Sequence, residues 1–255
     1  MASSTTWIRG ALLGPGELRD RLRRCLLDAK RFLDTTTTPE LLDLLLGHKQ
    51  ACRSLLGSAA RLHHIGFVVP PGAEEIISSV AAEAGFTLGH TAVSSILIAR
   101  ELEQLAGKPR VPTTVFKQYG KTVASQRVAV EVFLTNEDER LVRTWIEKGV
   151  GSHVAIELSD ASIFAEVGRL FPAEGLAMPP FMDDSPRFSK NEGVTFMYFD
   201  LGLRSPLRLE ILGRGDLSDL GRRPGSASIW ASGSTRAPEP GRKNLDPPRQ
   251  RFSRS

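Results

Sequence analysis

Two segments that carry histidine near their start, LHHIGFVV and SHVAIEL, open two similar stretches of the chain, and each stretch closes on a glutamate within an apolar run. These glutamates are Glu131 in RVAVEVFL, 67 residues after His64, and Glu210 in LRLEIL, 57 residues after His153. Imidazole and carboxylate groups together are typical ligands of Zn²⁺, Ni²⁺, Co²⁺, Mn²⁺ and Fe²⁺. The four residues therefore predict a site for one of these divalent metal ions.

Each of the four runs alternates polar and apolar residues with the period of two that is typical of a β-strand. In every run the histidine or glutamate shares one face with small or cationic residues, and apolar residues fill the opposite face. We expect helices to cover the apolar faces and the polar faces to form a concave sheet surface. A carboxylate buried alone on that surface would be costly, and a bound cation would offset the cost.

Other polar residues lie close to these four in the sequence. Arg127 and Arg208 share faces with the glutamates, where they could hold an anionic substrate or form ion pairs with the glutamates. Glu157 shares a face with His153 and is either a supporting partner of that histidine or an exposed residue near the strand end. His90, in a predicted Gly-His-Thr turn, is expected to be structural or exposed.

The elements that carry these residues form two series with the same order of strand, helix and β-rich runs. The first series lies at 61–70, 73–85, 111–120 and 126–134. The second series lies at 152–159, 160–175, 192–201 and 205–213. A short helix at 136–149, capped by Asn136, separates them, and the first series carries an insertion around 86–110. The repeat predicts an α+β fold of two paired βαβββ modules, 61–150 and 151–213, that form a concave mixed sheet.

Residues 1–60 precede the repeat and are predicted to form a helical extension. Apolar residues recur there near a period of 3.6 over 15–59, which indicates two helices. Thr38 is the predicted N-cap of the second helix, with Pro39 in its first turn. His48 lies in this extension and is expected to be structural or exposed. The extension could serve as a packing arm or a dimer element.

The net charge of +4 is concentrated at the end of the chain. Residues 222–255 hold eight Lys and Arg against two Asp and Glu, which leaves a net charge of −2 for the rest. Nucleic-acid binding is disfavoured because it requires a basic face on a folded domain. Residues 214–255, rich in Pro, Gly, Ser and Arg, form a tail that is expected to be disordered.

Composition also predicts where the protein resides. The chain has no run of eighteen apolar residues, so no membrane span is expected, and its start, MASSTTWIRG, lacks the features of a signal peptide. We therefore expect a cytoplasmic protein. Cys25 and Cys52 have no zinc-site spacing and are expected to be free thiols in a reducing compartment, with an inter-helix disulfide as the alternative.

Residues 62–213 resemble the vicinal oxygen chelate superfamily, which includes glyoxalases, bleomycin-resistance proteins and extradiol dioxygenases. In its enzymes the metal ligands lie at the start of the first strand and the end of the last strand of each paired βαβββ module. The glyoxalase I branch uses the order His, Glu, His, Glu. The matching positions in this sequence are His64, Glu131, His153 and Glu210. His64 is preferred to His63 because it directly precedes IGFVV, as the second histidine precedes VAIEL.

The resemblance implies a divalent metal cofactor (Zn, Ni, Co, Mn or Fe) that binds neighbouring oxygens of a substrate and stabilises an oxyanion. Glu131 and Glu210 are both candidates for the base that moves a proton next to a carbonyl. Such a site fits an epimerase, an isomerase or a glyoxalase-like lyase acting on a small polyhydroxylated substrate, for example a sugar-like cyclitol. Candidate substrate contacts are Arg127, Arg208, Lys117, Gln118, Tyr119, Lys121 and Tyr198.

Two other functions are compatible with the resemblance. A non-haem iron dioxygenase of the same fold would use two histidines and one carboxylate, would require Fe²⁺ and O₂, and would tolerate loss of one glutamate. A metal-free small-molecule binding or resistance protein would need none of the four ligands and would use a groove shared in a dimer. Whether the modules pair within one chain or across a homodimer is open.

Overall fold

The computed structural model describes most of the chain up to residue 220. The described residues are 6–93, 114–123, 125–179, 182, 186–190, 193–201 and 207–220. They belong to the first of two compact units, Met1–Arg222, and the second unit, Arg223–Ser255, lies outside them. The predictions of an insertion around 86–110 and of a disordered tail therefore fall largely outside the described residues.

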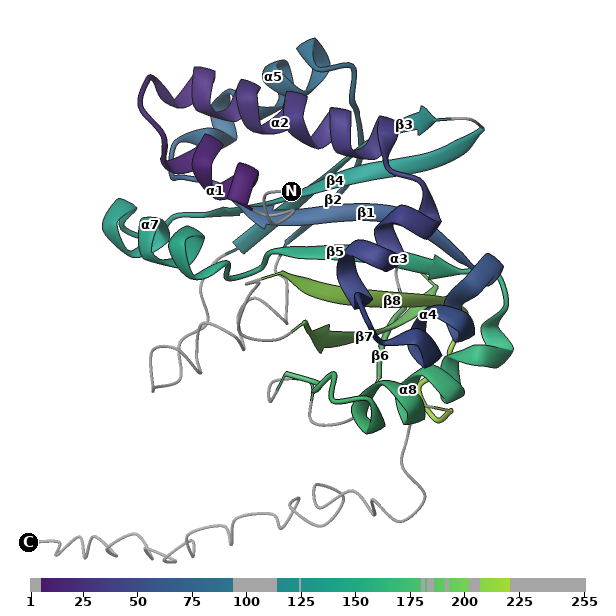
Figure 1. Ribbon diagram of the computed structural model, residues 1–255. Helices are drawn as coiled ribbons and strands as arrows, with labels where there is room; N and C mark the ends of the chain where they lie inside the picture. The colour runs from purple at the N-terminus through teal and green to yellow at the C-terminus, as the bar shows by residue number, and fades with distance from the viewer. Residues whose placement is uncertain are drawn as a thin grey trace, which may run out of the picture. The chain divides into compact units, whose positions relative to one another are not determined.

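Eight strands form one sheet in the order β2-β3-β4-β1-β5-β8-β7-β6 (Figure 1). The strands of the first half are β1 (Ala60–Val68), β2 (Thr87–Val93), β3 (Thr114–Val123) and β4 (Gln126–Thr135). The strands of the second half are β5 (His153–Leu158), β6 (Arg187–Ser189), β7 (Val194–Asp200) and β8 (Arg208–Arg214). The two halves meet where β1 pairs with β5.

Both halves of the sheet have the same topology. β1 pairs in parallel with β4, and β5 pairs in parallel with β8, whereas β1 and β5 are antiparallel at the centre. Antiparallel pairs complete each half. A helix follows the first strand of each half, α5 (Ile77–Glu83) in one and α8 (Phe164–Ala173) in the other. The predicted α+β fold of two paired βαβββ modules in a mixed sheet is confirmed.

Helices lie across one face of the sheet (Figure 1). Those of the N-terminal extension are α1 (Thr6–Leu13), α2 (Leu18–Thr35), α3 (Thr38–Leu46) and α4 (Gln50–Leu56), and α7 (Glu139–Lys148) connects the modules. α2 contacts β1 and β4, and both α3 and α7 contact β1. The apolar strand faces, including Phe67, Val130 and Ile156, are buried in one core with these helices. The opposite faces of the central strands are therefore left to the polar residues.

The extension differs from the prediction in its helix boundaries. Thr37 and not Thr38 is the N-cap of α3, and it forms a capping box with Glu40. A residue can cap only while its own backbone is extended, and Thr38 is already helical. The second predicted helix divides into α3 and α4 because Gly47, at φ 53°, ends α3 in a conformation that favours glycine.

Three further boundaries also differ. Asp138 and not Asn136 caps α7, because its carboxylate accepts two hydrogen bonds from backbone N–H groups of the first turn. The helix predicted at 73–85 begins as a short 3-10 turn over Ala73–Glu75 before α5. His90, expected in a turn, lies in β2 next to a register irregularity.

Cys25 on α2 and Cys52 on α4 are free thiols, as predicted, and both are buried. Burial raises the pKa of both thiols, and that of Cys25 lies well above its ordinary value. Within the described part of the chain, none of the helices has the length and apolar character needed to cross a bilayer.

Candidate metal centre

The two central strands and the strands that flank them bring four predicted residues together. His64 is on β1 and His153 on β5, while Glu131 is on β4 and Glu210 on β8. The register is the same in both halves: Gly66 lies beside His153 and Glu131, and Ala155 lies beside His64 and Glu210. The two histidines and the two glutamates are thus related by the pseudo-two-fold symmetry of the sheet.

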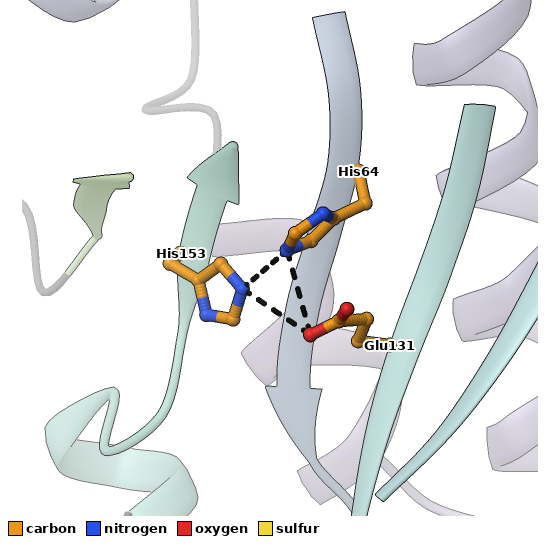
Figure 2. A group of neighbouring side chains, drawn as sticks. All are labelled: His64, Glu131 and His153. Atoms are coloured by element: carbon orange, nitrogen blue, oxygen red, sulfur yellow. Dashed lines mark hydrogen bonds and ion pairs between the residues drawn. The ribbon is translucent and has the colours of Figure 1, made fainter. Parts of the chain in front are cut away.

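Their ligand atoms converge on one point. The Nε2 atoms of His64 and His153 are 2.8 Å apart. His64 Nε2 lies 2.9 Å from Glu210 Oε2 and 3.4 Å from Glu131 Oε2. His153 Nε2 lies 3.4 Å and 3.7 Å from the same two oxygens. Figure 2 shows His64, Glu131 and His153 pointing toward one another, and their ligand atoms all lie within 4.8 Å of one another.

The cluster is buried, which limits the ways in which its charges can be balanced. The side chains of His64, His153 and Glu210 are 4%, 3% and 6% exposed, and that of Glu131 is 12% exposed. Glu210 Oε2 is a buried atom, and the residues that the structure describes offer it no well-aligned hydrogen-bond donor. Two carboxylates beside two imidazoles in so little water are the donor set of a divalent cation. The residues present fit a metal ion.

Local sequence explains how His153 reaches this point. Its ring lies over Gly66 on the neighbouring strand, where a Cβ atom would come within 2.1 Å of Cε1 of the imidazole. Only glycine at this position leaves room for the ring. Gly66, two positions after His64, is therefore the residue in the sequence that signals the approach of the His153 ring from the neighbouring strand.

Three of the four residues are oriented by hydrogen bonds with neighbouring groups. His153 Nδ1 is 3.0 Å from the carbonyl oxygen of Gly151. Gln118 Nε2 donates to Glu131 Oε1 at 2.9 Å, and the Tyr198 hydroxyl hydrogen-bonds Glu210. These three contacts aim the ligand atoms at one another.

Gln118 and Tyr198 occupy equivalent positions in the two modules. Gln118 is the register partner of Glu131 in the β3–β4 pair, and Tyr198 is the register partner of Glu210 in the β7–β8 pair. Both were predicted as substrate contacts, and in the structure both hold a carboxylate. The signal was available in principle, because a residue opposite a ligand in a β-hairpin shares its face.

The fourth residue, His64, has a histidine neighbour. A register irregularity in β1 between Leu62 and His64 places His63 where an extra residue is accommodated. Nδ1 of His63 lies 2.8 Å from Nδ1 of His64, and the two rings meet edge to face with centroids 5.0 Å apart. The two consecutive histidines therefore contact each other through their side chains.

Burial and neighbouring charges decide the protonation states. Burial lowers the pKa of His63 to about 3, with further lowering by His64. Burial also lowers the pKa of His153, so its imidazole is neutral near pH 7. Burial alone would raise the pKa of Glu210, but the adjacent His64 and His153 lower it overall. A neutral His153 and an ionised Glu210 are the protonation states that metal ligation requires of these two residues.

The predicted substrate contacts are distributed between the two faces of the sheet. Tyr198 lies in the cluster, with its ring 5.5 Å from that of His153. Arg208 Nε is 3.0 Å from Asp200 Oδ1, so this arginine forms an ion pair with an aspartate of β7. Lys117 is the register partner of Val132, one residue out of phase with Glu131, and the structure does not bring it to the cluster.

Arg127 lies on the cluster side of the sheet and is exposed. Its guanidinium crosses two glycines of neighbouring strands: a Cβ atom at Gly89 would come within 2.3 Å of Nη2, and one at Gly120 within 3.0 Å of Nε. Because neither glycine has a side chain, the arginine has room to lie across both strands. Arg127 also contributes to the low pKa of His63, which places its charge near that ring.

Three further residues that the sequence suggested for the site contact residues outside the cluster. Tyr119 is buried toward the helices, with its hydroxyl 3.0 Å from Ser78 Oγ. Lys121 forms an ion pair with Asp34 of α2. Glu157 forms an ion pair with Arg214, and so does not support the ring of His153.

Comparisons by sequence return no match: no protein-family model and no curated protein matches this chain. Comparisons of structure do return matches, and these bear on the fold alone. The chain is structurally similar to methylmalonyl-CoA epimerase over about 60% of its length.

The Streptomyces coelicolor enzyme, solved as a variant with 2-nitronate-propionyl-CoA, is 15% identical, with 63% of this chain and 99% of that chain covered and a TM-score of 0.41. The Mycobacterium tuberculosis enzyme is 10% identical, with 60% and 87% covered and a TM-score of 0.40. A hypothetical protein from Bacillus halodurans is 13% identical, with 62% and 97% covered and a TM-score of 0.40.

Proposed function

We propose that this protein is a divalent-metal-dependent epimerase or isomerase, or a glyoxalase-like lyase, that transfers a proton next to a carbonyl group. The observation that carries the proposal is the convergence of two imidazoles and two carboxylates on one buried point. Glu210 Oε2 supports the proposal most directly: it is buried, it faces both Nε2 atoms, and no well-aligned hydrogen-bond donor reaches it from the described part of the chain. A cation would satisfy it.

His64, His153, Glu131 and Glu210 would hold the metal ion, which is Zn²⁺, Ni²⁺, Co²⁺, Mn²⁺ or Fe²⁺ on the chemistry of the donors. When bound, such an ion acts as a Lewis acid toward a carbonyl oxygen. His64 and His153 serve only to bind, since both Nε2 atoms face the centre of the cluster.

The two glutamates carry the proton. Glu131 and Glu210 lie on the outer strands of the central four, on opposite sides of the histidine pair. In an epimerisation one carboxylate would remove a proton from one face of the carbon, and the other would return a proton to the opposite face. Gln118 and Tyr198 hold the carboxylates, and the Tyr198 hydroxyl also stabilises the ionised form of Glu210.

The proposed substrate is small, polyhydroxylated and anionic or phosphate-bearing. Arg127 supports the anionic part, since its guanidinium lies on the cluster side of the sheet and makes no hydrogen bond or ion pair within the described part of the chain. Arg208, already paired with Asp200, is the weaker candidate. Lys117, one residue out of phase with Glu131 on β3, is the weakest of the proposed substrate contacts.

One observation favours a second function. His64, Glu131 and His153 form a group whose ligand atoms all lie within 4.8 Å of one another, which is the two-histidine, one-carboxylate composition of non-haem iron oxygenases. In a dioxygenase Glu210 would not ligate the metal, and its loss would leave iron binding intact. The two proposals therefore differ in what Glu210→Gln does.

The first experiment is elemental mass spectrometry of the purified full-length protein, beside His153→Ala, Glu210→Gln and, as a control, His48→Ala at an exposed turn. We expect about one metal ion per chain in the wild type and the control, a large loss in His153→Ala, and a clear loss in Glu210→Gln. Iron retained in Glu210→Gln, together with O₂ consumption, would favour the dioxygenase. No metal in the wild type, even after addition of divalent ions, would overturn both proposals and favour a metal-free binding protein.

The second experiment tests the proton transfer. The metal-loaded protein is incubated in D₂O with a panel of hydroxyketones, sugar phosphates and 2-substituted acyl thioesters, and deuterium at the carbon next to the carbonyl is followed by NMR. We expect incorporation into one class of compound, lost in both Glu131→Gln and Glu210→Gln. Incorporation that survives in both variants would contradict the assigned roles of the glutamates.

A further inference from the structure

We propose that His63 is a positioning residue for the metal centre: its Nδ1 atom accepts a hydrogen bond from Nδ1–H of His64 and so holds His64 in the tautomer that presents Nε2 to a metal ion. The inference rests on the proposed function, because it assigns a role that only a ligating His64 requires. His63 itself lies outside the set of four converging ligand atoms.

The geometry determines which ring nitrogen of His64 can bind a metal ion and which one must carry the proton. Its Nε2 atom faces the other three members of the cluster, at 2.8 Å from His153 Nε2 and 2.9 Å from Glu210 Oε2. A metal ion takes the lone pair of a ring nitrogen, so a ligating Nε2 carries no proton, and the proton of a neutral ring must then reside on Nδ1. His63 Nδ1, at 2.8 Å, is the group placed to accept it.

The other histidine shows the same device with a different acceptor. His153 Nδ1 lies 3.0 Å from the carbonyl oxygen of Gly151, which can only accept, so Nδ1 is the donor and Nε2 is free to ligate. Each glutamate likewise has its own donor, Gln118 or Tyr198. His63 gives His64 the orienting partner that the other three residues have.

An irregularity in the pairing of β1 with β5 allows His63 and His64 to contact each other. In a regular strand the side chains of consecutive residues point to opposite faces, so His63 and His64 could not touch. The register irregularity between Leu62 and His64 turns His63 toward the same side. Two positions later Gly66 has resumed regular pairing with His153 and Glu131, so the irregularity is confined to the point where it brings the two histidines together.

The test uses Zn²⁺ as the probe and measures its affinity by competition with a chromophoric chelator, for the wild type, His63→Leu, His63→Asn and the control His48→Leu. Leucine removes the acceptor, whereas the amide oxygen of asparagine lies near the position of a histidine Nδ1. We expect His63→Leu to bind Zn²⁺ roughly 10- to 100-fold more weakly, His63→Asn to recover most of the affinity, and the control to match the wild type.

A second readout needs no variant. Long-range ¹H–¹⁵N correlation spectra of the zinc-loaded wild type distinguish protonated from unprotonated ring nitrogens. We expect His64 to be protonated at Nδ1 and His63 to be unprotonated at Nδ1. The opposite assignment would overturn the inference, as would Zn²⁺ binding by a folded His63→Leu protein within threefold of the wild type.

The two levels of proposal fail in different ways. A wild type that binds no Zn²⁺ contradicts the metal centre itself. A wild type that binds Zn²⁺, but whose affinity and His64 protonation do not depend on His63, contradicts only the positioning role of His63.

Discussion

The imidazole of His153 lies directly over the backbone of Gly66, so closely that a Cβ atom at residue 66 would be 2.1 Å from Cε1 and 2.6 Å from Nε2 of the ring. The two residues are register partners across the antiparallel centre of the sheet. The ring can therefore reach the cluster only because the facing position has no side chain.

We expect Gly66→Ala to displace the His153 ring and to weaken Zn²⁺ binding by at least about tenfold, the scale seen when a ligand loses its support. A matched control is Ala155→Gly at the equivalent position of the other module, which removes a methyl group and adds only the backbone-entropy cost of about 1 kcal/mol. Zinc affinity by chelator competition and the thermal midpoint are measured together. Unchanged affinity in a folded Gly66→Ala protein would contradict the steric argument.

The Tyr198 hydroxyl holds Glu210, and its loss should affect the site more than the fold. We expect Tyr198→Phe to lower Zn²⁺ affinity and deuterium incorporation by about 10- to 100-fold, because the buried carboxylate loses a hydrogen bond that supports it. Tyr119→Phe is the matched control, since its hydroxyl bonds Ser78 on the helical side. Equal effects of the two changes on zinc affinity would show that Tyr198 has no special role.

The stability of the metal-free protein should fall as the pH is lowered from 6.5. The pKa of His63 is about 3 in the folded protein against 6.5 for an ordinary histidine. Between these values the unfolded chain binds a proton that the folded chain does not, so the stability is fully present above pH 6.5 and is lost toward pH 3. The loss is at most about 1.4 kcal/mol per pH unit for one such group.

The lowered pKa of His153 acts in the same direction. The measurement is the free energy of unfolding in urea at pH 8, 6.5 and 5, a range in which ordinary carboxylates stay ionised. We expect little change from pH 8 to 6.5, a decrease from pH 6.5 to 5, and a smaller decrease in His63→Asn. Identical curves for the variant and the wild type would rule out His63 as a source of the effect.

Cys25 and Cys52 should be unreactive in the folded protein. Burial raises the pKa of both thiols, which keeps them in the un-ionised form that reacts slowly. We expect a thiol reagent to label neither residue at pH 8 under native conditions and to label both in urea. Rapid native labelling of Cys25 would contradict its packing within α2 and the core.

The sequence alone was sufficient to predict the repeat and the four residues that come together on the sheet. Four strands alternate with a period of two, and each carries a histidine or glutamate on one face, so the pattern itself indicated which side chains would share a sheet surface. His64, Glu131, His153 and Glu210 could be chosen on this basis. The pattern left open whether the two modules pair within one chain or across a homodimer, and the pairing of β1 with β5 comes from the tertiary structure.

Tertiary structure alone decided the neighbours of these residues. The contact of His63 with His64 depends on an interruption of regular strand pairing, which periodicity cannot reveal. The role of Gln118 depends on register, because a shift of one residue exchanges it with Lys117. Arg208 pairs with Asp200 for the same reason. Register and irregular pairing arise from contacts between strands, so a single strand's sequence determines its faces but not the residues that lie beside it.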